Sequence, residues 1–96
     1  MKDLYDFSAE DIKDIMVKEC LRDEKAKELF ESVMHDLMVR ARAGAKESFL
    51  TFEDTAKEVL AGLDEKTFIK AKARAWSLLS IRGFYVNEKG KITYKI

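Results

Sequence analysis

The 96-residue chain contains no proline, one cysteine, one histidine and four glycines, and its 18 Lys and Arg residues balance 18 Asp and Glu residues. Because proline breaks helix interiors and sheet ladders, its absence permits long uninterrupted elements. The single cysteine, Cys20, excludes an internal disulfide and is typical of a reducing compartment, so we expect a cytoplasmic location. No apolar run approaches the roughly 20 residues that span a bilayer, and the N-terminus lacks the apolar core of a signal peptide, so we expect no membrane partner.

The remaining composition is typical of one soluble globular domain. Hydrophobic residues make up 47% of the chain and charged residues 38%, which does not fit a disordered protein. The length suits one domain, because compact domains most often have about 100–150 residues. We therefore expect a single domain over 1–96, with an N-terminal helical extension (1–22) and a core (23–96).

Two helices are predicted in the N-terminal half. Ser8 and Asp11 have the spacing of a capping box and predict a helix over 9–21, with Phe7 and Ile12 placed to form a hydrophobic staple. The next helix is predicted over 23–43, because apolar residues recur there every three or four positions. These apolar residues are Ala26, Leu29, Phe30, Val33, Met34, Leu37, Met38 and Ala41. Gly44 is a natural residue to end this helix, since it adopts positive φ without steric cost.

The middle of the chain predicts a strand followed by two more helices. Residues 48–52 are aromatic and rich in β-formers, which favours a strand. Thr51, with Asp54 three residues later, caps a helix over 53–62. Asp64 then caps a helix over 65–82 after a tight turn.

The C-terminus predicts a β-hairpin. Its strands are 84–86 and 91–96, and Gly90 suits the left-handed position of the turn between them. Alternation along the last strand places Ile92, Tyr94 and Ile96 on one face and Lys91, Thr93 and Lys95 on the other. An isolated hairpin is marginal, so we expect the 48–52 strand to join it. The prediction is an α+β fold of four helices and a three-stranded antiparallel sheet, in the order α-α-β-α-α-β-β.

The zero net charge is the sum of two opposed parts. Residues 1–65 hold 10 basic and 17 acidic residues, a net charge of −7, whereas residues 66–96 hold eight basic residues and one acidic residue, a net charge of +7. This asymmetry favours an anionic partner for the basic part.

Helical spacing locates part of this positive charge. At about 100° per residue, one narrow arc of the 65–82 helix carries a basic ridge, and the hairpin turn adds two lysines. The predicted nucleic-acid-binding residues are Lys66, Lys70, Arg74, Ser77, Lys89 and Lys91. The alternative is that the ridge is a solvated face whose cations balance the acidic part of the same chain. Lys72 points into the apolar arc and must lay its stem over apolar surface.

Residues 23–96 resemble a winged helix-turn-helix domain in the order of their elements. Leu79, Gly83 and the apolar strand after it are similar to that family's passage from recognition helix into wing. The resemblance implies that the 65–82 helix enters the major groove of DNA and that Lys89 and Lys91 contact phosphates. Residues 40–44 through 83–86 also resemble, more loosely, small phage accessory proteins, which commonly bind a host protein.

The chain carries no recognisable catalytic or cofactor motif, so we expect a non-enzymatic protein with no cofactor and no metal. His35 and Cys20 lie on different predicted helices, and nothing in the sequence brings a nucleophile, a base and an orienting group together. Glu31 and His35 supply at most two metal ligands, and two ligands do not make a site. Cys20 is expected to be a small buried hydrophobic residue.

Two alternatives to nucleic-acid binding remain open. The helix over 9–21 is not needed by a winged module, so it is the candidate surface for a protein partner or for a homodimer. Met16, Met34 and Met38 could line a partner groove or fill the core, and Trp76 is expected to pack in the core. The second alternative is a plain oligomerisation module.

Overall fold

The computed structural model describes residue 6 and residues 8–95, which form four helices and three strands. In chain order these are α1 (Ala9–Arg22), α2 (Glu24–Arg42), β1 (Glu47–Thr51), α3 (Phe52–Val59), α4 (Glu65–Ile81), β2 (Phe84–Val86) and β3 (Lys91–Tyr94). The predicted α+β class and the order α-α-β-α-α-β-β are confirmed.

Polar side chains cap every helix at its N-terminus. The Ser8 hydroxyl accepts the N–H of Asp11 at 3.2 Å, and the Asp11 carboxylate accepts the N–H of Ser8 at 2.9 Å, so the predicted capping box forms. Phe7, the other half of the predicted staple, lies outside the described residues. The Asp64 carboxylate caps α4, and the hydroxyl and N–H of Thr67 hold its pKa below the ordinary value.

Several predicted boundaries differ from the observed ones by one to three residues. The last strand, predicted over 91–96, ends at Tyr94, and residue 96 lies outside the described residues. Phe52 begins α3 instead of ending β1, because the Thr51 hydroxyl already accepts the N–H of Asp54 at 3.1 Å. The same helix ends at Val59 and not at residue 62. Gly62 has a φ of 86° and belongs to the turn that reverses the chain toward α4.

The three strands form one antiparallel sheet in the order β1-β3-β2, so the last strand of the chain is the central one. Gly90 closes the hairpin with a φ of 80°, as predicted. Thr93, predicted on the polar face of β3, is buried, and its hydroxyl is satisfied by donating to the carbonyl of Lys46 at 2.7 Å.

A buried serine completes the irregular ladder between β1 and β3. The register between these strands shifts between Glu47 and Thr51. Ser48 lies in this stretch, where its hydroxyl accepts the N–H of Ile92 at 3.0 Å and donates to the carbonyl of Leu50 at 2.6 Å. The side chain thus takes the place of a backbone carbonyl for a buried donor.

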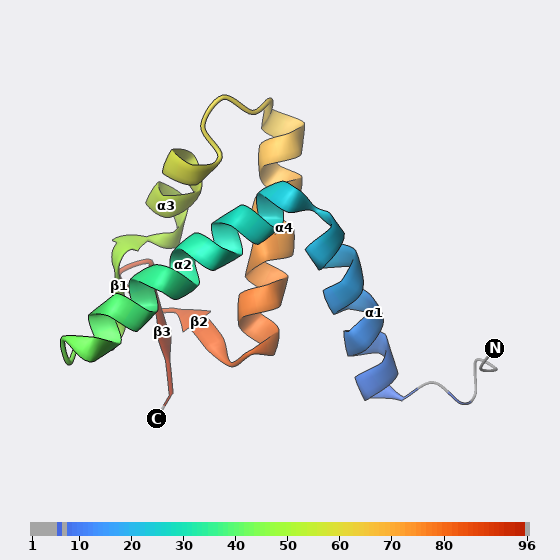
Figure 1. Ribbon diagram of the computed structural model, residues 1–96, viewed down its shortest axis with the longest axis horizontal. Helices are drawn as coiled ribbons and strands as arrows, with labels where there is room; N and C mark the ends of the chain where they lie inside the picture. Colours follow the sequence, from blue (N-terminus) through green and yellow to red (C-terminus); the bar gives the residue numbers. More distant parts are fainter. Residues whose placement is uncertain (1–5, 7, 96) are drawn as a thin grey trace.

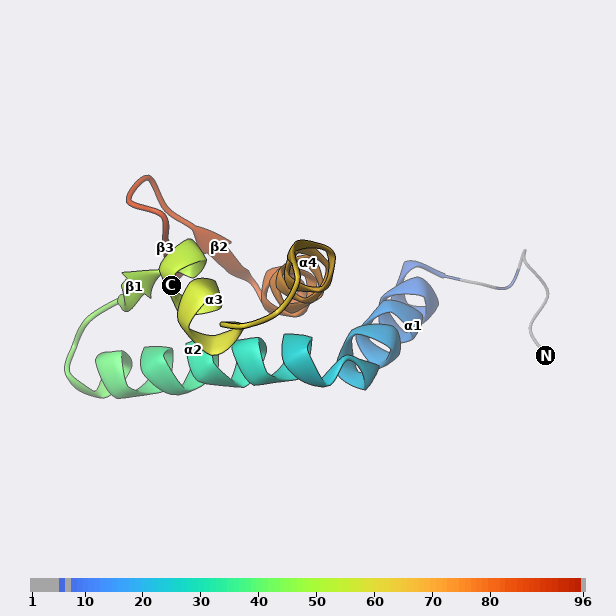
Figure 2. The same cartoon turned by 90° about the horizontal axis from the view of Figure 1, so that it is seen from above.

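Helix α2 is the centre of the architecture. It packs against α3, α4 and β1, which lie on one side of it in Figure 2, while α1 extends from its N-terminal end and contacts α4 (Figure 1). The core consists of Ala26, Leu29, Val33, Leu37, Ala56, Leu60, Ala71, Ala75, Leu79 and Ile92. Trp76 packs at its edge, with its ring 5.7 Å from that of Phe52.

The last turn of the apolar stripe on α2 is not covered. Met38 is 53% exposed and Ala41 is exposed, although both belong to the stripe predicted to face the core. The stripe is longer than the elements that pack on it. Among the described helices, none has the length and apolar character needed to cross a bilayer.

Candidate functional site

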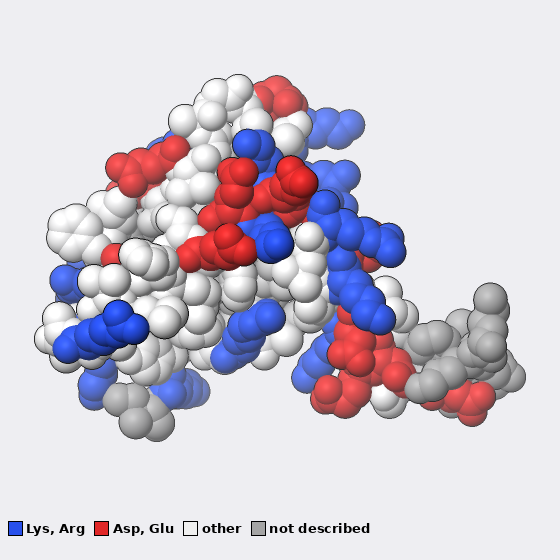
Figure 3. All heavy atoms as spheres, in the orientation of Figure 1, with Lys and Arg blue, Asp and Glu red and all other residues white. Residues whose placement is uncertain are grey.

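The first half of the basic ridge is open to solvent. Lys66 and Lys70 are exposed on the first two turns of α4, and neither forms an ion pair within the described part of the chain. Figure 3 shows Lys and Arg side chains along the edge where α4 and α1 meet, with acidic side chains beside them over the start of α2. Two cations on one helix face can contact an anionic partner directly.

The second half of the ridge is held by the chain itself. The Arg74 guanidinium lies 3.2 Å from the Asp23 carboxylate, and the two side chains are only 33% and 16% exposed. Asp23 also caps α2 through the N–H groups of Lys25 and Ala26, each at 3.1 Å. Ser77 is half-buried and donates to the carbonyl of Ala73. Arg74 therefore ties α4 to the junction between α1 and α2.

Helix α1 explains why the ridge stops at Arg74. Leu78, one turn later on the same side of α4, is fully buried but lies outside the main core. Cys20 on α1 is also buried outside that core, as predicted, and burial raises the pKa of its thiol while the nearby Arg74 lowers it in part. Since α1 contacts α4, it covers this stretch of the predicted recognition helix.

The hairpin lysines face an acidic group of β1. Lys89 and Lys91 each lie 3.6 Å from the Glu47 carboxylate, which also accepts a hydrogen bond from the Asn87 amide at 2.9 Å. The Asn87 hydrogen bond, followed by the two lysines, holds the pKa of Glu47 below its ordinary value. The positive charge of the turn is therefore partly compensated within the sheet.

Lys72 is also paired with a carboxylate, and its side chain lies over apolar surface as predicted. Its ammonium lies 5.3 Å from the centre of the Phe68 ring and pairs with Glu53. With Arg74, Lys89 and Lys91, four cations of the basic C-terminal part now face carboxylates of the acidic part. Much of the opposed charge seen along the sequence is thus internal balance.

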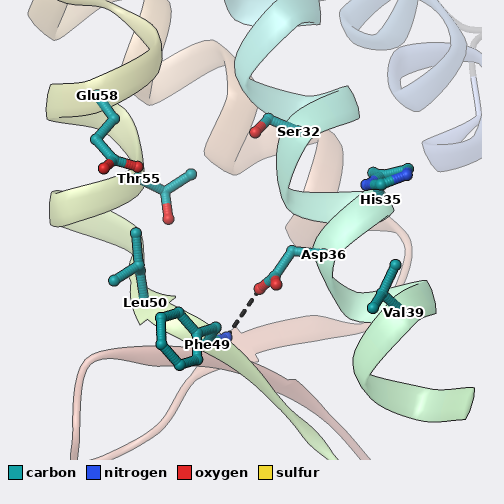
Figure 4. A pocket seen from close by; sticks show the side chains of 8 residues that line it. All are labelled: Ser32, His35, Asp36, Val39, Phe49, Leu50, Thr55 and Glu58. Atoms are coloured by element: carbon teal, nitrogen blue, oxygen red, sulfur yellow. Dashed lines mark hydrogen bonds between the residues drawn. The ribbon is translucent and has the colours of Figure 1, made fainter. Parts of the chain in front are cut away.

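A hollow of mixed polarity lies between α2, β1 and α3, and its titratable side chains are not brought together (Figure 4). Figure 4 shows Asp36 accepting the backbone N–H of Phe49 at 2.8 Å, while His35 lies on the outer side of α2, turned away from Glu58. The Asp36 carboxylate, which could otherwise orient His35 as a base, is therefore hydrogen-bonded to the backbone of β1. Within residues 8–95, no group of three or more His, Cys, Asp or Glu side chains could hold a metal ion.

An apolar groove lies between the end of α2 and the hairpin. It has a volume of about 590 Å³ and basic side chains at Arg82 and Lys95. Its apolar lining consists of Met34, Leu37, Met38, Ala41, Phe84 and Tyr94. Met34 and Met38, predicted to fill the core or to line a partner groove, both line this groove. We call it the α2–hairpin groove.

The N-terminal turns of α1 carry a second exposed apolar surface. Ile12, Ile15 and Met16 are 57%, 50% and 38% exposed. Their spacing places them on one helix face, which we call the α1 apolar face. The capping box predicts the helix itself. Which of its side chains are exposed depends on the elements that pack beside it.

Comparisons with known proteins give no further guidance, since no family model, no curated protein and no solved structure matches this chain.

Proposed function

We propose that the chain is a non-enzymatic protein-binding domain that presents α1 to its partner. The observation that carries this proposal is the α1 apolar face, in which Ile12, Ile15 and Met16 are each more than a third exposed. Cys20, one turn after Met16 on the same helix, is buried near Arg74 of α4, so the C-terminal turns anchor α1 while the α1 apolar face on its N-terminal turns remains exposed. A rigid helix with an outward apolar face is the usual ligand of a hydrophobic groove.

The free energy available from burying these side chains supports a binding role. Full burial of one Ile or Met side chain contributes about 1.5–3 kcal/mol, and roughly half of that remains available at each of these three residues. Covering the α1 apolar face thus contributes about 2–4 kcal/mol before the costs of association. An accessory protein that binds a host protein is the form of this function favoured by the looser resemblance, and the buried thiol of Cys20 fits a reducing compartment such as the cytoplasm.

Replacing Ile15 with glutamate is expected to reduce partner capture at least tenfold, because a charge would have to be buried in an apolar contact. The full chain, tagged at its C-terminus, is used to capture proteins from cells of its source, and the captured proteins are quantified by mass spectrometry. Ile69→Glu is the matched control, since Ile69 is 53% exposed on α4, outside the α1 apolar face. Equal capture by the Ile15→Glu variant and the unaltered chain would contradict the proposal.

Nucleic-acid binding is the second candidate, favoured by the exposed pair Lys66 and Lys70. The winged helix-turn-helix resemblance of residues 23–96 supports it, because the elements follow one another in the order that the resemblance requires. In this form of the function α4 approaches DNA through its first two turns. Lys89 and Lys91 then contact phosphate in place of Glu47.

If this second candidate holds, Lys66→Glu combined with Lys70→Glu should weaken binding to duplex DNA at least tenfold. Loss of two phosphate contacts should also make the slope of log K against log salt shallower by about 1.8. Fluorescence anisotropy at several salt concentrations measures both effects. The control combines Lys27→Glu and Lys57→Glu, which changes the net charge equally at exposed lysines of α2 and α3. Salt-independent or undetectable binding by the unaltered chain would exclude this candidate.

A further inference from the structure

The α2–hairpin groove and the α1 apolar face have complementary properties in the same molecule. The groove has an apolar lining with two cations, Arg82 and Lys95, and no acidic residue. The α1 apolar face offers Ile12, Ile15 and Met16, and the exposed Glu19 lies one turn beyond Ile15 on the same side of the helix. At 590 Å³ the groove is within the range of about 300–1,000 Å³ found for pockets that bury apolar ligands.

The two surfaces also match in length. The groove follows α2 from Met34 to Ala41, a distance of about 10 Å at 1.5 Å per residue. On α1, Ile12 to Glu19 covers the same seven steps, or about 10 Å. With Ile12 and Ile15 against the methionines, Glu19 lies within the length of the groove, whose lining includes Arg82 and Lys95.

We propose that the α2–hairpin groove binds α1 of a second copy of this chain, so that two copies form a dimer by reciprocal exchange of α1. This proposal rests on the proposed function of α1 as a protein-binding helix and names its partner. Figures 1 and 2 show α1 and the strands toward opposite ends of α2, so the groove is not filled by α1 of its own chain and a second copy would have to supply the helix. Such a closed contact uses each helix and each groove once.

The charges at the rim favour this occupant over an uncharged helix. Glu19 pairs with Arg22 at 2.8 Å within one chain, but both side chains are more than half exposed, so the pair contributes little and is readily exchanged. Arg82 packs with its guanidinium 4.8 Å from the Phe30 ring and donates to the carbonyl of Leu78, which fixes one cation at the groove. Glu19, beside the apolar residues of α1, would thus meet the positive rim of the groove.

Sedimentation velocity of the full chain over a concentration series tests association. The unaltered chain and the Ile69→Glu control should shift from monomer to dimer as concentration rises. Ile15→Glu on α1 and Met38→Glu in the groove should each raise the dissociation constant at least tenfold. Both side chains are half-exposed, so the variants keep the fold, which circular dichroism checks. A monomer at all concentrations, or sensitivity to only one of the two substitutions, overturns the proposal.

Cross-linking identifies the contacting surfaces directly. In a Cys20→Ala background, a chain with Ile12→Cys is mixed with a chain with Met38→Cys and treated with a short thiol cross-linker. Helix-in-groove exchange predicts that mixed dimers exceed both kinds of self-linked dimer at least tenfold, while Ile69→Cys links to neither partner above background. Self-linked Ile12→Cys dimers in excess would show α1 pairing with α1, which refutes the groove as the site but leaves α1 as a protein-binding helix. The failure of this inference is thereby distinguished from the failure of the proposed function.

Discussion

Replacing Leu79 with alanine is expected to lower the free energy of unfolding by about 3–4 kcal/mol, because the substitution leaves a cavity in the core in addition to the loss of apolar burial. Leu79 is fully buried on α4 and belongs to the cluster that joins α4 to α2, α3 and the central strand β3. A domain of this size has a total stability of roughly 5–14 kcal/mol, so one substitution removes a large share of it. Urea unfolding followed by circular dichroism measures the loss.

The control for this prediction is Ile69→Ala on the same helix. Ile69 is more than half exposed, and alanine is the better helix former, so the change in unfolding free energy should stay within about 0.5 kcal/mol. A loss below about 1 kcal/mol for Leu79→Ala would mean that α4 does not pack into the core as described. The neighbouring Leu78 is a separate case, since it is buried outside the main cluster on the side where α1 lies.

The helix starts could be predicted because their determinants lie within four residues. Ser8 and Asp11 bond each other's backbone, and Thr51 and Asp64 accept N–H groups three residues ahead. Such contacts do not depend on the rest of the fold, so the order of the elements follows from the sequence. The exact ends follow less well, because Phe52 fits a strand and a helix equally and the cap at Thr51 decides between them.

The covered and uncovered surfaces could not be predicted in the same way. Met38 continues the apolar pattern of Leu37 and Met34, yet it is exposed because the packed elements are shorter than α2. Ser48 shows no pattern at all, since its buried role depends on how β1 pairs with β3, 44 residues later. Both outcomes depend on partners distant in sequence.

The partners of the basic ridge could not be predicted from the sequence either. Helical spacing placed Lys66, Lys70 and Arg74 along one arc, and the spacing holds in α4. The partner of Arg74 is Asp23, 51 residues earlier, and only the packing of α1 and α2 against α4 brings them together. The sequence could therefore locate the cations without showing which of them remain free.

Replacing Asp23 with alanine is expected to lower the free energy of unfolding by about 2 kcal/mol, because this carboxylate has two structural roles. It accepts the N–H groups of Lys25 and Ala26 at the start of α2, and loss of such a cap costs about 1 kcal/mol. It also pairs with Arg74 while only 16% exposed, and a charge-assisted hydrogen bond of this kind contributes about 1.5 kcal/mol or less once solvent screening is included. Urea unfolding at neutral pH measures the sum.

Two further variants separate the roles of Asp23. Asp23→Asn keeps an oxygen that can cap α2 but removes the charge, so it should cost about half as much as Asp23→Ala. Arg74→Met keeps the apolar stem and removes the guanidinium. A double-mutant cycle between Asp23→Asn and Arg74→Met should give a coupling of about 0.5–1 kcal/mol, because residues in direct contact are not additive. Additivity within about 0.3 kcal/mol would show that the pair does not hold α4 to the α1–α2 junction, and Arg74 would then be as available to an anionic partner as Lys66 and Lys70.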